Sequence, residues 1–351
     1  MPQTISAPLE SHYQGRVTRL CTIFKVTRAD GQIFGFTDHN RNILFGGVTY
    51  KAATGYTGSA VQSVAGLASG NLEVQGFFNS AAVTEEDVRA GRWDHAALEM
   101  HEVNWSDLTM GARWLAKGRL GEVRSGKQVF EAELLSLARR LQQSVGRLYQ
   151  PDCDADVGDA RCKVRLDPPA WAATTAYTVR PAGEAGLGSV VKPSAFNGRY
   201  FECATAGTSG GAEPAWNTTI SGTTNDGTVV WRAIRAYRFN ATVTSVSDPQ
   251  HFFASALSDP PDGWFEQGLA TWLTGANAGL AMEIKQHINT GGEIKLKFPM
   301  PFAIAAGDTV RLQAGCLKRQ PEDCIAKYSN VRNHRGVHYL PGINKVAQQG
   351  F

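Results

Sequence analysis

The sequence predicts a mainly β protein with few helices, and three observations support this fold class. Short runs of alternating apolar and polar residues recur along the chain, Gly, Asp and Asn residues separate them, and only one segment has a strong helical period. The 351 residues, 42% of them hydrophobic, suffice for two or three cores. We therefore expect β-barrels or sandwiches built from short strands.

The first part of the chain contains alternating runs and two helical patterns. Expected strands occupy residues 19–28, 32–38, 47–53, 71–78 and 96–105, followed by a hairpin at 120–135. A helix that covers one face or mouth of the sheet is predicted from apolar residues three and four positions apart, namely Leu134, Leu137, Leu141, Val145 and Leu148. A second, short helix is expected at 83–91, with Thr84 as its N-cap.

Composition divides the remaining chain into an inserted module and a second set of strands. From Asp167 onward charged residues become few and Gly, Thr, Ser and Trp frequent, which indicates a small β module. Strands then resume at 238–246, 251–257, 279–287, 292–298 and 308–315. We therefore expect three domains, at residues 1–166, 167–237 and 238–351.

Charge and composition exclude several classes of protein. Lys and Arg total 35 against 32 Asp and Glu, and a net charge of +3 gives no basic footprint for nucleic-acid binding. We find no signal peptide and no apolar stretch long enough to span a membrane, so we expect folding in a cytosol. Six cysteines are too few for a disulfide scaffold. Two of them, Cys21 and Cys203, lie in apolar runs, and we expect them to be buried hydrophobic residues.

The other four cysteines form two spaced pairs in polar, turn-forming sequence. Cys153 and Cys162 lie in PDCDADVGDARC, and Cys316 and Cys324 lie in GCLKRQPEDC. Four thiolates suit either zinc or an iron–sulfur cluster. Disulfides are the third alternative, because a reducing compartment disfavours them. We expect a structural metal site that cross-links distant segments of the chain.

Candidate catalytic groups are few. Asp38 and His39 lie in TDHNR, and His334 and His338 lie in NHRGVH, but neither pair has the partners that acid–base or metal chemistry requires. The second pair lacks the glutamate of a HExxH helix. Because nucleotide-binding and nucleophile-elbow motifs are also missing from any useful context, we expect that the protein is not an enzyme.

Several strings together resemble a known family of phage proteins. These are FTDHNRNILFGGVTYKAATGY, GDARC and GDTVRLQAGCLKRQPEDCIAKYSNVRNHRGVHYLPG. They are similar to phage tail-tip hub proteins, a group that includes the BR0599-type and gene-transfer-agent hub proteins and, more distantly, minor tail protein L of phage lambda. The resemblance covers nearly all of residues 17–166 and 238–345.

The resemblance implies a structural role at the tip of a non-contractile tail. It implies tail-tube-like β-domains in a homotrimer set between the distal tail protein and the central fibre or spike, with the tape measure protein as a further contact. The protein would be assembled in the bacterial cytoplasm and carried in the virion. In lambda-type relatives four cysteines hold a [4Fe–4S] cluster, and by position they correspond to Cys153, Cys162, Cys316 and Cys324, with zinc as the alternative.

The inserted stretch has a resemblance of its own. WAATTAYTVRP, NGRYFECATAGTSGGAEPAW and NDGTVVWRAI are similar to small carbohydrate-binding-like modules of chitin-active enzymes and phage tail proteins. The match implies sugar stacking by five aromatic residues, Trp171, Tyr177, Tyr200, Trp216 and Trp231. A module this small has little else to bury, so we expect at least two of these rings to be structural. The alternative function is a cell-surface glycan-binding adhesin that acts through this module.

Overall fold

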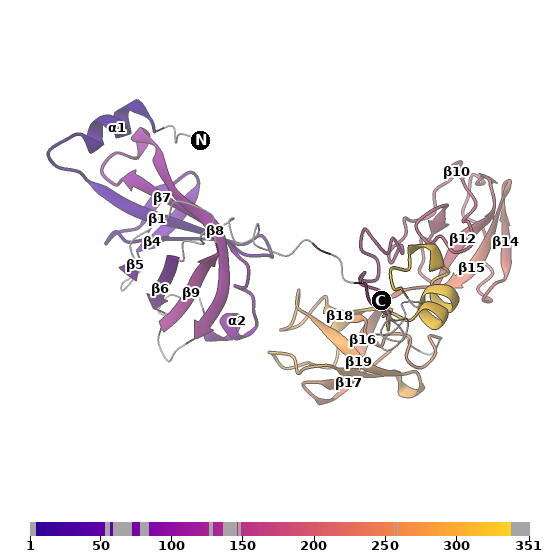
Figure 1. The fold of residues 1–351 in the computed structure, drawn as a ribbon. Coiled ribbons are helices and arrows are strands. Elements are labelled where there is room, and N and C mark those ends of the chain that lie inside the picture. The colour runs from indigo at the N-terminus through magenta and orange to yellow at the C-terminus, as the bar shows by residue number, and fades with distance from the viewer. Residues whose placement is uncertain are drawn as a thin grey trace, which may run out of the picture. The chain divides into compact units, whose positions relative to one another are not determined.

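The computed structural model describes residues 5–52, 57–58, 72–77, 84–125, 129–135, 146, 149–255, 257 and 259–337. The chain forms two compact units, Met1–Gly146 and Arg147–Phe351, and each is described by itself (Figure 1). Strands dominate both units, so the mainly β prediction is confirmed. The expected boundary at residue 166 lies inside the second unit. Because this unit begins at Arg147, it contains both cysteine pairs.

The first unit contains a sheet whose nine strands follow the order β3-β4-β2-β1-β7-β8-β9-β6-β5. Neighbouring strands are antiparallel except for β2 and β4, which are parallel. The strands are β1 Leu20–Thr27, β2 Ile33–Thr37, β3 Ile43–Phe45, β4 Val48–Ala52, β5 Thr57–Gly58, β6 Leu72–Phe77, β7 Ala97–Asn104, β8 Ala112–Ser125 and β9 Val129–Leu135.

The centre of this sheet is a long antiparallel pair with a core on each face. Strands β1 and β7 pair from Leu20 opposite Asn104 to Thr27 opposite Ala97. Because side chains alternate along a strand, one face buries Phe24 with Leu98, and the other buries Ile23, Cys21 and their neighbours. Cys21 is therefore the buried hydrophobic residue that the sequence predicts.

The helices of this unit are short. Helix α1 (Ala7–Tyr13) begins at the cap Ser6, and helix α2 (Glu85–Arg89) begins at Thr84, whose hydroxyl accepts a 3.1 Å hydrogen bond from the backbone of Asp87. The second short helix is thus confirmed. The longer predicted helix does not begin at Leu134, which lies in β9 opposite Leu72 and Leu120. Its other residues, Leu137, Leu141, Val145 and Leu148, lie outside the described residues, whereas a 3-10 turn, η1 (Leu108–Met110), is described.

The second unit is built around a closed six-stranded barrel with the order β16-β17-β20-β19-β18-β21. Its strands are β16 Arg238–Asp248, β17 His251–Ala254, β18 Leu269–Trp272, β19 Ala281–Ile288, β20 Glu293–Leu296 and β21 Thr309–Gln313. The barrel closes where β16 pairs with β21, from Arg238 opposite Gln313 to Thr242 opposite Thr309. Phe252, Trp272 and Phe265 lie in its buried core.

The inserted module packs against this barrel. It contains β10 Ala176–Tyr177, β11 Val190–Val191, β12 Arg199–Thr205, β13 Gly207–Thr208, β14 Thr223–Asp226 and β15 Val229–Arg235. Four of these strands form a sheet in the order β11-β12-β15-β14, which has its own small core around Phe201 and Trp231. Cys203 is buried in that core, as predicted. On the other face of β12, Tyr200 belongs to the barrel core, so the module and the barrel share buried surface.

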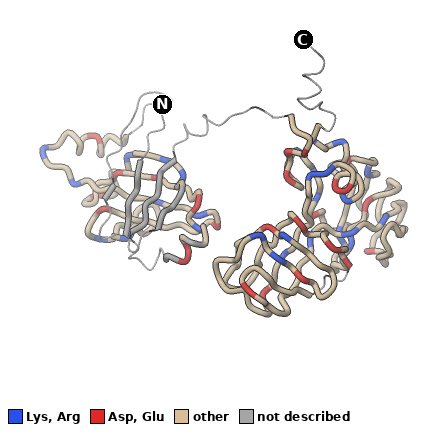
Figure 2. The backbone as a smooth tube through the Cα atoms, turned by 60° about the horizontal axis from the view of Figure 1, so that its bottom comes forward, with Lys and Arg blue, Asp and Glu red and all other residues tan. Residues whose placement is uncertain are grey.

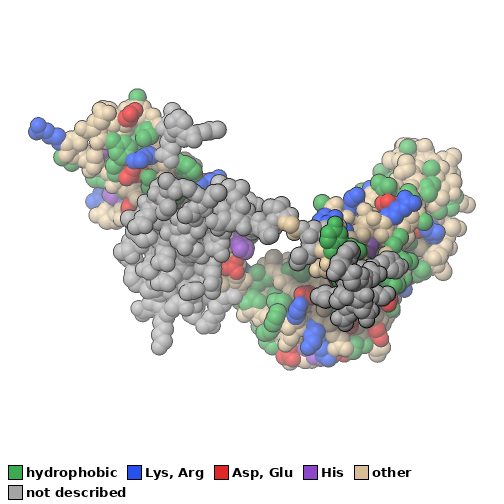
Figure 3. All heavy atoms as spheres, in the orientation of Figure 1, with side chains coloured by type: hydrophobic (Ala, Val, Ile, Leu, Met, Phe, Trp, Pro, Cys, Tyr) green, Lys and Arg blue, Asp and Glu red, His purple; other side chains and the backbone are tan. Residues whose placement is uncertain are grey.

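The chain that follows β21 forms irregular helical turns. They are η3, a π-helix at Gln320–Lys327, and η4, a 3-10 turn at Val331–Asn333, while a third short turn, η2 (Thr290–Gly292), joins β19 to β20. In the described part of the chain no helix has the length and apolar character needed to cross a membrane. Basic and acidic residues are interspersed along both units (Figure 2), and hydrophobic side chains are scattered among them on the visible face (Figure 3).

Candidate metal centre

The first cysteine loop is held in shape by the side chain of Asp159. One carboxylate oxygen accepts the backbone N–H groups of Arg161 at 2.9 Å and Cys162 at 2.6 Å. The other accepts the backbone N–H of Asp156 at 3.2 Å. A carboxylate that satisfies several backbone donors fixes a tight turn, so the two cysteines of this loop have defined positions.

The second cysteine segment is anchored on the barrel. Cys316 lies three positions after the end of β21, and Cys324 lies buried within η3. Lys327, at the end of η3, donates a 2.8 Å hydrogen bond to the carbonyl of Gly315, and its burial lowers the pKa of its ammonium group to about 8. The hydroxyl of Tyr328 donates to the same carbonyl at 2.8 Å. These bonds fix η3 against the strand end that precedes Cys316.

Cys324 lies within electrostatic range of the other three predicted ligands. Burial, together with the charges of Cys316, Cys153 and Cys162, raises the pKa of the Cys324 thiol to about 12. Burial likewise raises the pKa of Cys316 to about 11, again with a contribution from Cys162. Thiols from two distant segments are therefore gathered in one partly buried place, where a neutral thiol is favoured over a thiolate unless a cation is bound.

Hydrogen-bond donors surround these sulfur atoms. The backbone N–H of Lys318 lies 3.4 Å from the sulfur of Cys316, and the side-chain amide of Asn330 lies 3.7 Å from that of Cys162. The Nδ1 atom of His334 is 3.2 Å from the sulfur of Cys324. Such contacts stabilise sulfur that carries negative charge, as a metal-bound thiolate does.

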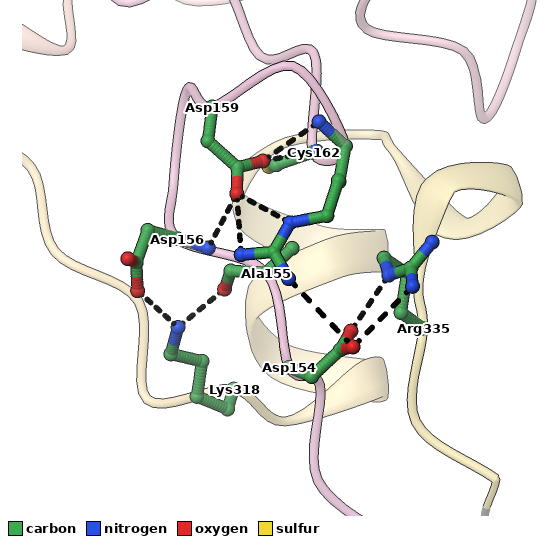
Figure 4. A network of polar contacts seen from close by, with 8 residues as sticks. Asp154, Ala155, Asp156, Asp159, Cys162, Lys318 and Arg335 are labelled. Carbon is green, nitrogen blue, oxygen red and sulfur yellow. Dashed lines mark hydrogen bonds and ion pairs between the residues drawn. The ribbon is translucent and has the colours of Figure 1, made fainter. Parts of the chain in front are cut away.

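Ion pairs join the two segments outside the sulfur atoms (Figure 4). The ammonium of Lys318 crosses from the second segment to the first, where it binds the carbonyl of Ala155 and, at 2.9 Å, the carboxylate of Asp156. Asp154 accepts a 2.6 Å hydrogen bond from Arg335. The first loop, the segment after Cys316 and the end of the described chain thus meet at one site.

Asn330 connects this site to the inserted module. Its side-chain amide donates to the carbonyl of Cys162 at 2.6 Å, while its side-chain oxygen accepts the backbone N–H of Ala185 at 3.0 Å. Asn330 is only 1% exposed, so both bonds are shielded from water. The sequence analysis did not identify Asn330, because an asparagine in NVRN is typical of any turn and its partners lie far away along the chain.

The inserted module supports the same region through a buried ion pair. Arg180 pairs with Glu202 at 2.6 Å, and both side chains are almost completely buried. The same guanidinium donates a 2.6 Å hydrogen bond to the carbonyl of Tyr328. The module is therefore fastened to the segment that carries Cys324.

The described residues show neither a preformed site for a single metal ion nor a disulfide. Tetrahedral zinc needs sulfur atoms about 3.8 Å apart, given Zn–S bonds of about 2.3 Å. Among the described residues no group of three His, Cys, Asp or Glu side chains is arranged to hold one metal ion. All six cysteines are free thiols, so no disulfide joins the two pairs.

The five aromatic residues of the predicted sugar site have two different environments. Tyr200 and Trp231 are completely buried and form part of the core, which excludes them as a sugar-stacking surface. Trp171, Tyr177 and Trp216 are half-buried and pack against the module core. The indole of Trp216 stacks on Phe201 at 4.0 Å, which occupies one of its faces.

The candidate catalytic residues form no acid–base pair in the described part of the chain. Asp38 accepts the backbone N–H of Thr22 at 2.8 Å, and His39 accepts that of Arg41 at 3.1 Å. His334 contacts Cys324, and His338 lies outside the described residues.

Comparisons with known proteins agree with this β-rich architecture. Residues 6–165 match a family model described as the N-terminal attachment domain of a baseplate hub protein, and residues 263–344 match the phage conserved hypothetical protein BR0599. No curated protein matches the chain. A chain from the virion of a native gene transfer agent particle has 30% sequence identity and a TM-score of 0.72, and the match covers 97% of this chain and 94% of that one.

These matches define the class as structural components of phage-like particles. The chain belongs to the family of baseplate hub proteins found in phages and gene transfer agents, which confirms the resemblance seen in the sequence. It is a component of the virion particle and associates there with other tail proteins.

Proposed function

We propose that the protein is the tail-tip hub subunit of a non-contractile tail. In this role a homotrimer links the ring of the distal tail protein to the central fibre or spike and contacts the end of the tape measure protein. The match over nearly the full length of a gene transfer agent virion chain supports this role, as does the match to an attachment domain. Its work is assembly, without catalysis.

We further propose that Cys153, Cys162, Cys316 and Cys324 hold a [4Fe–4S] cluster, with zinc as the alternative. The observation that carries this proposal is that the two cysteine segments meet, since Lys318 bonds to Ala155 and Asp156, and Asn330 bonds to the carbonyl of Cys162. A bound cluster would supply four metal–thiolate bonds, which cross-link the loop at 153–162 to η3. Lys318, Asn330 and His334 would hold the thiolates in place through hydrogen bonds.

Elemental analysis of anaerobically purified protein tests the metal. We expect about four iron and four acid-labile sulfide ions per chain. Zinc without sulfide would show that the alternative metal is bound. The absence of both iron and zinc would contradict the metal site. The variants C162S and C324S should lose the metal and yield insoluble or tail-defective protein. C203S is the matched control, because Cys203 is buried in the module core and takes no part in the site.

Glycan binding through residues 167–237 is the alternative function. The half-buried rings of Trp171, Tyr177 and Trp216 are the remaining candidates for sugar contact. The indole N–H groups of the two tryptophans already have partners, since Trp171 donates to Asp226 and Trp216 donates to Glu213, each at 2.7 Å. These bonds favour a structural role for the rings, so the hub function is preferred.

A further inference from the structure

A basic cleft lies beside the cysteine centre. Its volume is about 560 Å³, and its walls come from the first cysteine loop and from the end of the described chain. Four of the lining side chains are cationic, namely Arg161, Lys163, Arg332 and Arg335, and no lining residue is acidic. We propose that this cleft binds an acidic peptide segment of a neighbouring particle protein. The inference rests on the proposed hub function and adds the chemistry of one partner.

The ion pairs of the cleft leave its open side positive. Asp154 and Asp159 hold Arg161, and Asp154 also pairs with Arg335. These carboxylates do not line the cleft, so they orient the two guanidinium groups without closing it. Guanidinium groups held in this way keep a fixed orientation, and each carries five N–H donors, more than one carboxylate accepts.

The other two cations are more open to a ligand. In the described part of the chain Lys163 has no acidic partner, and its side chain is exposed. Arg332 is 67% exposed and has only a distant partner, Glu184, at 3.7 Å. An incoming carboxylate therefore meets two cations that need not break a close ion pair in order to bind it.

The backbone of the cleft is already fixed. The N–H of Lys163 donates to the carbonyl of Asp159 at 2.8 Å, and the N–H of Arg332 donates to that of Gly183 at 3.1 Å. The N–H of Val337 donates to the carbonyl of Gln150 at 2.9 Å. Because the walls are tied to three different segments, binding costs little ordering of the protein.

Two exposed apolar residues are adjacent in sequence to residues that contact the cleft walls. Tyr149 is 75% exposed and precedes Gln150, which is bonded to Val337 on the cleft wall. Leu187 is 54% exposed and follows Gly186, which packs directly against the side chain of Lys163. Protein interfaces combine such apolar anchors with charged groups. None of the residues that line the cleft is a Trp, Tyr or Phe, the side chains on which bases stack best, so a peptide fits better than a nucleic acid.

Binding of labelled peptides to the purified, metal-loaded protein tests this proposal. The probe is a fluorescent hexaglutamate peptide flanked by leucines, and the comparison is the same peptide with glutamine. We expect the glutamate peptide alone to bind, with an affinity that falls as salt is raised. The double variant K163E/R332E should bind it roughly tenfold more weakly, because two attractive pairs become repulsive.

Matched variants separate docking from folding and from the metal. K163R/R332K keeps both charges and should bind like the original protein. K285E makes the same change on an exposed barrel residue far from the cleft lining, and should leave binding unchanged. An unaltered iron content in K163E/R332E would show that the centre is intact, so that loss of docking is distinct from failure of the hub proposal. Equal binding of the glutamine peptide, preferential binding of single-stranded DNA, or full binding by K163E/R332E would overturn the inference.

Discussion

At the scale of single residues, His287 is the titratable group whose burial has the clearest consequence for stability. It lies in β19, is 1% exposed, and packs edge-on against the ring of Phe265. Burial lowers the pKa of its imidazole from 6.5 to about 4, and the nearby Asp262 offsets only part of this effect. The folded barrel therefore holds His287 neutral under conditions in which the unfolded chain protonates it.

This shift predicts acid destabilisation of the barrel in a defined pH range. The stabilising effect is complete above pH 6.5 and is lost as pH falls toward 4, because the unfolded state binds the proton first. Between pH 7 and pH 5 the contribution to the free energy of unfolding should fall by about 2 kcal/mol. Urea denaturation at both pH values should show this loss in the original protein and a smaller loss in H287L.

An exposed histidine provides the control for this measurement. His95 lies on the surface with a positive φ of 57°, a conformation that asparagine tolerates. The variant H95N should therefore keep the full pH dependence. An identical pH response in H287L and the original protein would mean that His287 is not the responsible group.

At the scale of structural elements, the sequence predicted strands better than it predicted the helix. Alternation identified β1, β2 and β7 and five of the six barrel strands, because each buries one face. It missed β18, where Leu269 is apolar yet 39% exposed, so that apolar and polar residues do not alternate. Leu134 fitted a helical spacing, yet it lies in β9 and pairs with Leu72 of the neighbouring strand β6. Pairing between distant strands therefore overrides a local helical period.

The four cysteines proposed as ligands could be selected from the sequence, whereas the residues that support them could not. Paired cysteines in turn-forming sequence can be recognised from their residue type and spacing. The contacts of Asn330 with Cys162 and Ala185 depend on three segments that meet only in the folded chain. No local pattern marks such a residue, so only the structure reveals it.

Asn330 is therefore one of the residues through which the inserted module supports the cysteine loops. Replacing it by alanine leaves the carbonyl of Cys162 and the N–H of Ala185 without partners in a buried place, at a cost of about 1–3 kcal/mol. Replacement by aspartate should cost more, because a carboxylate then faces that carbonyl and the sulfur of Cys162.

Thermal denaturation of N330A and N330D, together with their iron content, tests this role. N240A is the control, since Asn240 is exposed on β16 and makes one long bond of 3.4 Å to Arg311. Its stability should change by less than about 0.5 kcal/mol. If N330A is as stable as N240A and retains its iron, the module does not support the centre through Asn330.

At the scale of the whole molecule, the position of the cysteine centre limits what a metal can stabilise. The sequence predicted a cross-link between distant segments of the chain, and both of these segments belong to the compact unit Arg147–Phe351. Spacing along the chain could not reveal this, because the unit boundary depends on which segments pack together. A bound metal therefore ties the start of this unit to its end and has no ligand among the described residues of Met1–Gly146.

Removal of the metal should consequently affect one unit and spare the other. Oxidation and chelation of the anaerobic protein should speed hydrogen exchange in the cysteine segments and in residues 183–188, which Asn330 and Arg332 contact through Ala185 and Gly183. Peptides from β1 and β7 serve as the internal control and should exchange at an unchanged rate, since their core lies wholly in the first unit. Faster exchange in β1 and β7 after chelation would show that the two units are stabilised together, and that the centre does more than fasten one of them.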